Sequence, residues 1–412
     1  MAPRKIAQLI ISIALVLLWA RLGLGWGFYS TALVSQFLAV ALASVCIFHF
    51  SVRRELLDLL GVLGTAAILA YVDFGILRYP VRSIAWFSFL GLGSFLLLAL
   101  RLVWESNENR KILALALLPS LLFITSDWFA YYLLLFTEKL HPRVLDLYLY
   151  AFDAGLRIQF PFLIGQWFRK LPLLGITSYY FYVGLPVIIA VVYTGQLLRD
   201  ARRGISAMTA FLITGPIGIF FYNLFPALGP IHVFQDDFPW HFLTLAQVQK
   251  LLLEPLPITG PRNAIPSLHM SWVLLTWWFS RGLSPWRRVL AMLFLLFTFL
   301  STLGLGEHYF VDLVVAVPFS LFIRSLCTFE LSWTNRERLW GIFAGLSLTL
   351  AWFALLRFAP KAFLFSALLP WGLIVVTVSI CLYLENGIKQ QVPADSREVT
   401  QSDALAATIS AT

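Results

Sequence analysis

The sequence predicts an all-α, polytopic membrane protein, a helical bundle with about twelve transmembrane helices. Three observations support this prediction. Hydrophobic residues make up 60% of the 412 positions, charged residues only 12%, and the mean hydropathy is +0.82. A soluble domain is closer to half apolar and a quarter charged. Apolar runs of roughly twenty residues, the length that crosses a bilayer, recur along the whole chain.

The expected spans divide the chain into four parts. They lie at about 6–24, 29–50, 56–77, 83–104, 112–136, 174–197, 207–227, 266–283, 287–304, 309–328, 338–357 and 361–384. N-terminal transmembrane helices fill 1–111, a central part covers 112–328, and C-terminal transmembrane helices fill 329–385. A polar tail, 386–412, is expected to be disordered.

Two connections in the central part are long. Residues 137–173 mix apolar, aromatic and charged side chains, which predicts an interfacial amphipathic helix on the outer surface. Residues 228–265 form a polar, Pro-rich outer loop that would cover a site at this face.

Charge predicts the orientation. The net charge is +9, and basic residues concentrate in connections that would all lie on one side of the membrane. Such a bias marks the cytoplasmic side, so we expect both termini in the cytoplasm and the helix ends carrying His269 and His308 on the extracytoplasmic side. The sequence has no long basic tract, so we expect no nucleic-acid partner. Short polar tails without a retention signal favour a bacterial inner membrane.

His308 and Asp312 are the first candidate catalytic residues. Their i, i+4 spacing places both on one face of a helix. An aspartate beside a histidine holds the imidazole in one tautomer and stabilises its positive charge, so the histidine can act as a base or nucleophile. A structural pair at a helix terminus is the alternative.

A second group lies at the start of another apolar run, in "GPRNAIPSLHMSW". His269 could transfer protons, Ser267 could cap the helix, and Arg262, Asn263 and helix N–H groups could bind phosphate. Tyr309, next to His308, could contact a headgroup or serve as an interfacial aromatic residue. Structural roles remain open for each residue. The two histidines lack a third clustered ligand, so we expect no metal and no cofactor.

The motifs "PSLH" at 266–269 and "GEHYFVD" at 306–312 resemble the second and third signatures of the type 2 phosphatidic acid phosphatase (PAP2) superfamily. This resemblance covers roughly 112–328 and implies a six-helix catalytic core. It also implies that His308 is a nucleophile forming a phosphohistidine, that Asp312 orients it, and that His269 is the general acid and then base.

The sequence departs from the superfamily pattern at its customary phosphate-binding cations. "YNLFPALGP" at 222–230 has no basic residue, and Ser301-Thr302 stands where Ser-Arg is usual. The pattern is more similar to the inositol phosphorylceramide synthase, or inositolphosphotransferase, branch. That resemblance implies transfer of a phosphate-linked headgroup, for example phosphoinositol, from a phospholipid donor to a lipid alcohol acceptor, as in sphingolipid metabolism. A lipid phosphate phosphatase, acting on phosphatidic acid or a polyprenyl diphosphate, and a lipid transporter or flippase are the alternatives.

Overall fold

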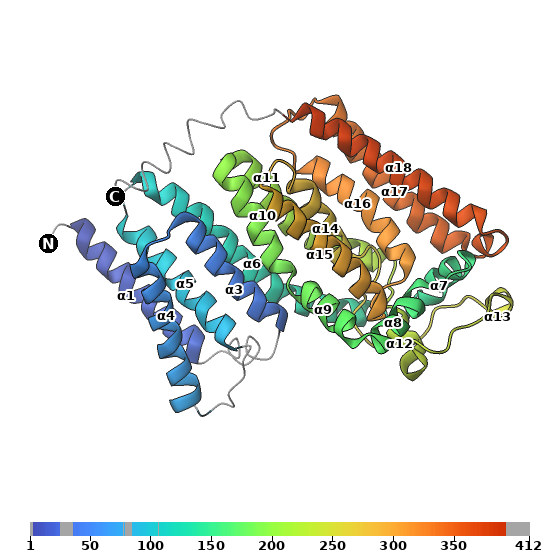
Figure 1. Cartoon of the computed structure of the whole chain (residues 1–412), viewed down its shortest axis with the longest axis horizontal. Coiled ribbons are helices and arrows are strands. Elements are labelled where there is room, and N and C mark those ends of the chain that lie inside the picture. Colours follow the sequence, from blue (N-terminus) through green and yellow to red (C-terminus); the bar gives the residue numbers. More distant parts are fainter. Residues whose placement is uncertain (1–2, 25–35, 77, 79–84, 106, 393–412) are drawn as a thin grey trace. The chain divides into compact units, whose positions relative to one another are not determined.

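Helices are the only regular elements in the part of the chain that the computed structural model describes, residues 3–24, 36–76, 78, 85–105 and 107–392 (Figure 1). The all-α prediction is therefore confirmed. The helices form two compact units. The first unit contains Met1–Ala130 and Pro186–Thr194, and the second contains Tyr131–Leu185 and Gly195–Thr412.

The first unit is built from the N-terminal helices α1 (Pro3–Leu24), α3 (Gln36–Val52), α4 (Leu56–Ala70) and α5 (Ala85–Trp104), with the first part of α6 (Asn107–Leu140). A π-helical turn, Tyr71–Ile76, continues α4. Helix α5 packs against α1, α3 and α4. Small residues permit this close packing, since a Cβ on Gly91 would lie 2.1 Å from the carbonyl oxygen of Leu42.

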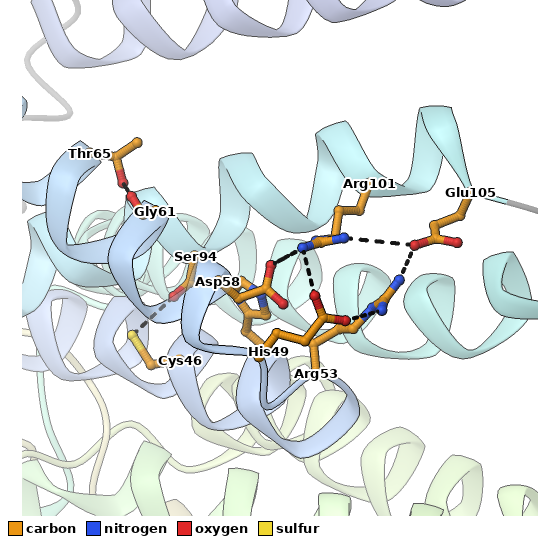
Figure 2. A network of polar contacts seen from close by, with 10 residues as sticks. Cys46, His49, Arg53, Asp58, Gly61, Thr65, Ser94, Arg101 and Glu105 are labelled. Atoms are coloured by element: carbon orange, nitrogen blue, oxygen red, sulfur yellow. Dashed lines mark hydrogen bonds and ion pairs between the residues drawn. The ribbon is translucent and has the colours of Figure 1, made fainter. Parts of the chain in front are cut away.

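Charged residues at one end of the first unit pair with one another (Figure 2). Arg101 on α5 donates to the buried carboxylate of Asp58 on α4, with Nε 2.7 Å from Oδ1. Arg53, just after α3, contacts both Glu55 and Glu105. Charges within or beside apolar helices are costly unless paired, so this network explains how α3, α4 and α5 carry them.

Helix α10 (Leu185–Arg199) is divided between the two units, because Pro186–Thr194 belongs to the first. The second unit holds the other helices of the described chain, which are α7 (Asp146–Gly155), α8 (Phe160–Lys170), α9 (Pro172–Val183), α11 (Ala201–Leu224), α12 (Pro230–Phe234), α13 (Leu245–Lys250), α14 (Leu268–Phe279), α15 (Pro285–Gly304), α16 (Phe310–Leu326), α17 (Arg336–Phe358) and α18 (Leu368–Gln391). Two short 3-10 helices, Gln235–Asp237 and Pro360–Leu364, lie in the connections of this unit, and Gln235–Asp237 directly follows the five-residue helix α12.

Helix α16 is the centre of the second unit. It packs against α11, α14, α17 and α18, and nearly all of its residues are buried. A helix that is apolar on every side is expected to be covered on every side. Helix α15 packs against α8, α9 and α14. The starts of α14 and α16 and the ends of α11 and α15 are joined by the segments that carry the candidate site.

Six helices of the described chain are long and apolar enough to cross a membrane, which supports an integral membrane protein. They are Leu56–Ile76, Trp86–Trp104, Ala201–Leu224, Pro285–Gly304, Arg336–Phe358 and Leu368–Gln391. Helices α9 and α10, bent by 52° relative to each other, are long and apolar enough only as a pair, which is the pattern of a broken span or of a re-entrant loop. The predicted count of about twelve is not confirmed. Helices α14 and α16 have only 12 and 17 residues, because the motif residues occupy the positions where each expected span would begin.

Two local predictions differ from the structure. Segment 137–173 is not one interfacial helix, since it contains the end of α6 and the separate helices α7 and α8. Every residue of α7 except Tyr148 is buried, and its two aspartates accept backbone N–H groups of the second unit. The expected tail begins later than predicted, since α18 continues to Gln391. The rest of that tail lies outside the described residues, as do residues 29–35 and 83–84 of two expected spans.

Candidate active site

His308 lies in the turn between α15 and α16. Its backbone N–H donates to the carbonyl of Thr302, 3.1 Å away. Asp312, in the first turn of α16, accepts the backbone N–H of Tyr309 at 2.8 Å, which satisfies one of the free donors of the helix start. The same Asp312 oxygen, Oδ2, lies 3.4 Å from Nδ1 of His308. One carboxylate therefore stabilises the start of α16 and holds the imidazole beside it.

Nδ1 of His308 lies near the carboxylate of Asp312, but the two groups are not aligned for a hydrogen bond. Both side chains are buried, and neither Nδ1 of His308 nor Oδ1 of Asp312 has a hydrogen-bond partner. Catalytic hydrogen bonds often lengthen in the absence of substrate and tighten when it binds. For Nε2 to be the reactive nitrogen, the ring must release its hydrogen bond with the backbone of Ala264 and turn Nδ1 toward Asp312.

Burial sets the charge state of His308. It lowers the pKa of the imidazole to about 4, against the raising effects of Glu307 and of a hydrogen bond with the backbone of Ala264. Glu307 is half-buried, and burial raises the pKa of its carboxyl. His308 is thus neutral near pH 7, which is the form with a free lone pair for attack.

His269 lies at the start of α14. Ser267 is the N-cap of this helix, as predicted, and its hydroxyl accepts the N–H of Met270. The N–H of Ser267 donates to the carbonyl of Asp312 at 3.2 Å, which ties the starts of α14 and α16 together. The imidazole of His269 stacks on the ring of Tyr182 and interacts electrostatically with His308. The two histidines of the sequence motifs are therefore close enough to influence each other electrostatically.

Helix α7 supplies two buried aspartates that hold the site together. Asp153 accepts the N–H groups of Phe310 and Val311 at 2.7 and 3.2 Å, so it binds the start of α16 from another helix. Asp146 accepts the N–H groups of Leu228 and Gly229 at 3.2 and 2.8 Å. Burial raises the pKa of Asp146 to about 7 and the pKa of Asp153 well above its usual range, against the lowering effect of these donors.

The segment "FPALGP", 225–230, lies between α7 and the turn that carries His308. Gly229 has a φ of +139°, and a Cβ there would lie 2.3 Å from the carbonyl oxygen of Glu307. The N–H of Ile231 donates to the carbonyl of Gly306 at 2.9 Å, which closes the contact. The glycine therefore allows this segment to touch the backbone next to His308.

Arg262 is engaged with backbone carbonyls. The side chain is buried, with Nε 2.9 Å from the carbonyl of His141 and Nη2 2.9 Å from that of Ile258. Its Nη1 donates to the carbonyl of Gly260. These hydrogen bonds indicate that Arg262 stabilises the conformation of the outer loop. A phosphate-binding role for Arg262 stays a prediction. The carbonyl oxygen of the Asn263 side chain is buried without a partner.

Tyr309 is buried, and its hydroxyl donates to Asp146 at 3.2 Å. Headgroup contact by Tyr309 therefore stays a prediction, while its structural role is clear. The sequence analysis singled out neither Asp146 nor Tyr182. A signal existed for the aspartates, because Asp146 and Asp153 are seven residues apart and thus lie on one helix face.

The central part of the chain is similar to one known protein family. Residues 147–326 match the PAP2 superfamily. The match covers less than half of the chain and lies inside the range of the resemblance drawn from the two motifs, which is confirmed here at the level of the superfamily. A PAP2 match supports a phosphatase or phosphotransferase that acts on lipids. The matched range includes nearly all of α7 and the helices α8 to α16, and it contains His269, His308 and Asp312. Searches among curated proteins and among solved structures find no match to this chain.

Proposed function

We propose that this protein is an integral-membrane lipid phosphotransferase that forms a phosphohistidine on His308. The observation that carries the proposal is the buried His308–Asp312 pair at the start of α16, joined to His269 at the start of α14. A neutral imidazole, an orienting carboxylate and a second imidazole are the groups that a two-step displacement at phosphorus needs.

In the first step, Nε2 of His308 attacks the donor phosphorus. The N–P bond forms while the P–O bond to the departing lipid, for example diacylglycerol, breaks. His269 gives its proton to the leaving alkoxide, and Asp312 stabilises the positive charge on the His308 ring. In the second step, His269 removes a proton from the acceptor hydroxyl, whose oxygen displaces His308 from phosphorus. At the end of the cycle a P–O bond to the acceptor has replaced the P–O bond to the donor, His308 is free and His269 is protonated again.

We propose a phosphodiester donor for this reaction. A phosphodiester carries one negative charge, whereas a phosphomonoester carries up to two. The guanidinium N–H groups of Arg262 donate hydrogen bonds to backbone carbonyls, and Glu307 adds an acidic group beside His308. Both features disfavour a doubly charged phosphate. They support transfer of a headgroup such as phosphoinositol to a lipid alcohol, the reaction implied by the inositol phosphorylceramide synthase-like pattern.

The proposal places the enzyme in a membrane, most simply a bacterial inner membrane, with both termini cytoplasmic. The active site would then face the extracytoplasmic side, because the basic connections lie at the other helix ends. A lipid phosphate phosphatase would use the same residues with water as acceptor, and Asn263, Ser267 or Arg262 would then bind a more highly charged phosphate.

The test is a lipid-product assay on the purified protein in detergent. Headgroup-labelled phospholipids are supplied with and without a ceramide or diacylglycerol acceptor. A new labelled lipid that requires both the acceptor and His308 is expected, and His308→Ala should abolish it. Labelled water-soluble phosphate that is independent of acceptor would favour the phosphatase. Lipid movement that persists in His308→Ala, without either product, would favour a transporter or flippase.

A further inference from the structure

Tyr182, near the end of α9, contacts His269 face to face. The two ring centroids are 3.9 Å apart and the planes differ by 18°. On another side, Trp272 meets the same imidazole edge-on, with centroids 5.8 Å apart and planes at 88°. His269 therefore contacts two aromatic rings, and Tyr182 is the one that lies nearly parallel to the imidazole.

The position of Tyr182 depends on a break in the chain. Helix α9 ends at Val183, and α10 starts at Leu185 after Gly184. A Cβ on Gly184 would lie 2.7 Å from the carbonyl oxygen of Tyr180, so a side chain there would push against the last turn of α9. Helix α9 also packs against α15, which leads directly into the turn that carries His308. Tyr182 itself is buried, with 8% of its surface exposed.

We propose that Tyr182 is a positioning residue for proton transfer by His269. This inference rests on the proposed function, in which His269 must be protonated in the first step and neutral in the second. The negative face of an aromatic ring attracts an imidazolium without carrying a charge of its own. A carboxylate in the same place would favour the protonated state throughout, whereas a ring face stabilises that state modestly and leaves the neutral state accessible.

Three variants separate the ring from its hydroxyl and from general packing. Tyr182→Phe keeps the ring face, and Tyr182→Leu removes it while remaining apolar. Tyr180→Leu is the matched control, since Tyr180 lies on the same helix and is 69% exposed. We expect Tyr182→Leu to lower kcat about tenfold or more, and Tyr182→Phe and Tyr180→Leu to stay within about threefold of the wild type. The limb of the pH–rate profile that depends on His269 should move to lower pH in Tyr182→Leu alone.

A second measurement does not require turnover. In protein labelled at the histidine rings, the Cε1–H resonance of His269, assigned with His269→Ala, should be shifted upfield because the imidazole lies over a ring face. We expect Tyr182→Leu to remove this shift, and Tyr182→Phe and Tyr180→Leu to retain it.

The outcomes separate the two proposals. A lost ring-current shift with a lowered kcat and a displaced pH profile, all rescued in Tyr182→Phe, would support the positioning role. Unchanged kcat and pH profile in an active Tyr182→Leu protein would overturn it while the proposed function stands. An equal loss in Tyr182→Phe would assign the effect to the hydroxyl and would also overturn it. If the wild type shows the shift but has no His308-dependent product, the proposed function fails, and the catalytic role of the stack fails with it.

Discussion

Asp153 offers the sharpest test of how α7 supports the site. Its carboxylate is fully buried and accepts two backbone N–H groups from the first turn of α16, those of Phe310 and Val311. Alanine at this position leaves both donors without a partner. Each unsatisfied buried donor costs about 1–3 kcal/mol, so Asp153→Ala should lower the free energy of unfolding by about 2–6 kcal/mol. Asp153→Asn keeps one acceptor oxygen and should lose about half as much.

The same substitution should impair catalysis. The first turn of α16 carries Asp312 and follows His308 directly, so release of this turn changes the geometry of the pair. A displacement of about 1 Å in a catalytic group can reduce the rate on the order of a hundredfold. We therefore expect Asp153→Ala to lose about that much kcat in the headgroup-transfer assay, with a smaller change in KM.

The assay compares thermal unfolding in detergent with the transfer rate for wild type, Asp153→Ala and Asp153→Asn. Asp236→Ala is the matched control, because Asp236 is an exposed acidic residue of the same unit. Asp153→Ala with wild-type stability and a wild-type rate would refute the reasoning that α7 holds the start of α16. A loss as large in Asp236→Ala would show that the effect is a general one of charge.

Three further predictions concern the segments around the site. Gly229→Ala should destabilise the protein by at least about 1 kcal/mol, because φ is +139° and the new Cβ would meet the carbonyl oxygen of Glu307; a wild-type melting temperature would contradict this. Asp146 has a pKa raised from 3.8 to about 7, so between these values the folded protein binds more protons and the free energy of unfolding falls as pH rises. Asp146→Asn should therefore show a smaller drop in melting temperature between about pH 5 and pH 8 than the wild type, and an unchanged drop would exclude this linkage. Arg262→Lys should lose carbonyl contacts and about 1–3 kcal/mol of stability with little change in KM, whereas a raised KM at unchanged stability would reveal a phosphate-binding role.

The catalytic motifs could be predicted from the sequence because their spacing is local. Residues four apart share a face only within a helix. His308 lies in the turn two residues before α16, so the spacing predicted its neighbour Asp312, but the pair forms at the helix start and not on a helix face. Ser267 as the N-cap of α14 follows from the same kind of local rule. The division of segment 137–173 into several helices could not be predicted in this way, because the residues that bury α7 are distant in the sequence.

The sequence by itself determined that this is a helical membrane protein and that His269, His308 and Asp312 are its candidate catalytic residues. Hydropathy reports the solvent that surrounds a segment, and short-range periodicity reports which side chains share a helix face. The tertiary structure alone decided that Asp153 and Asp146 hold α16 and the segment 225–230, and that Tyr182 covers His269. It also decided that Arg262 binds loop carbonyls. These contacts join residues far apart along the chain, and no local rule states which distant N–H, carbonyl or ring a buried side chain will meet once the helices pack.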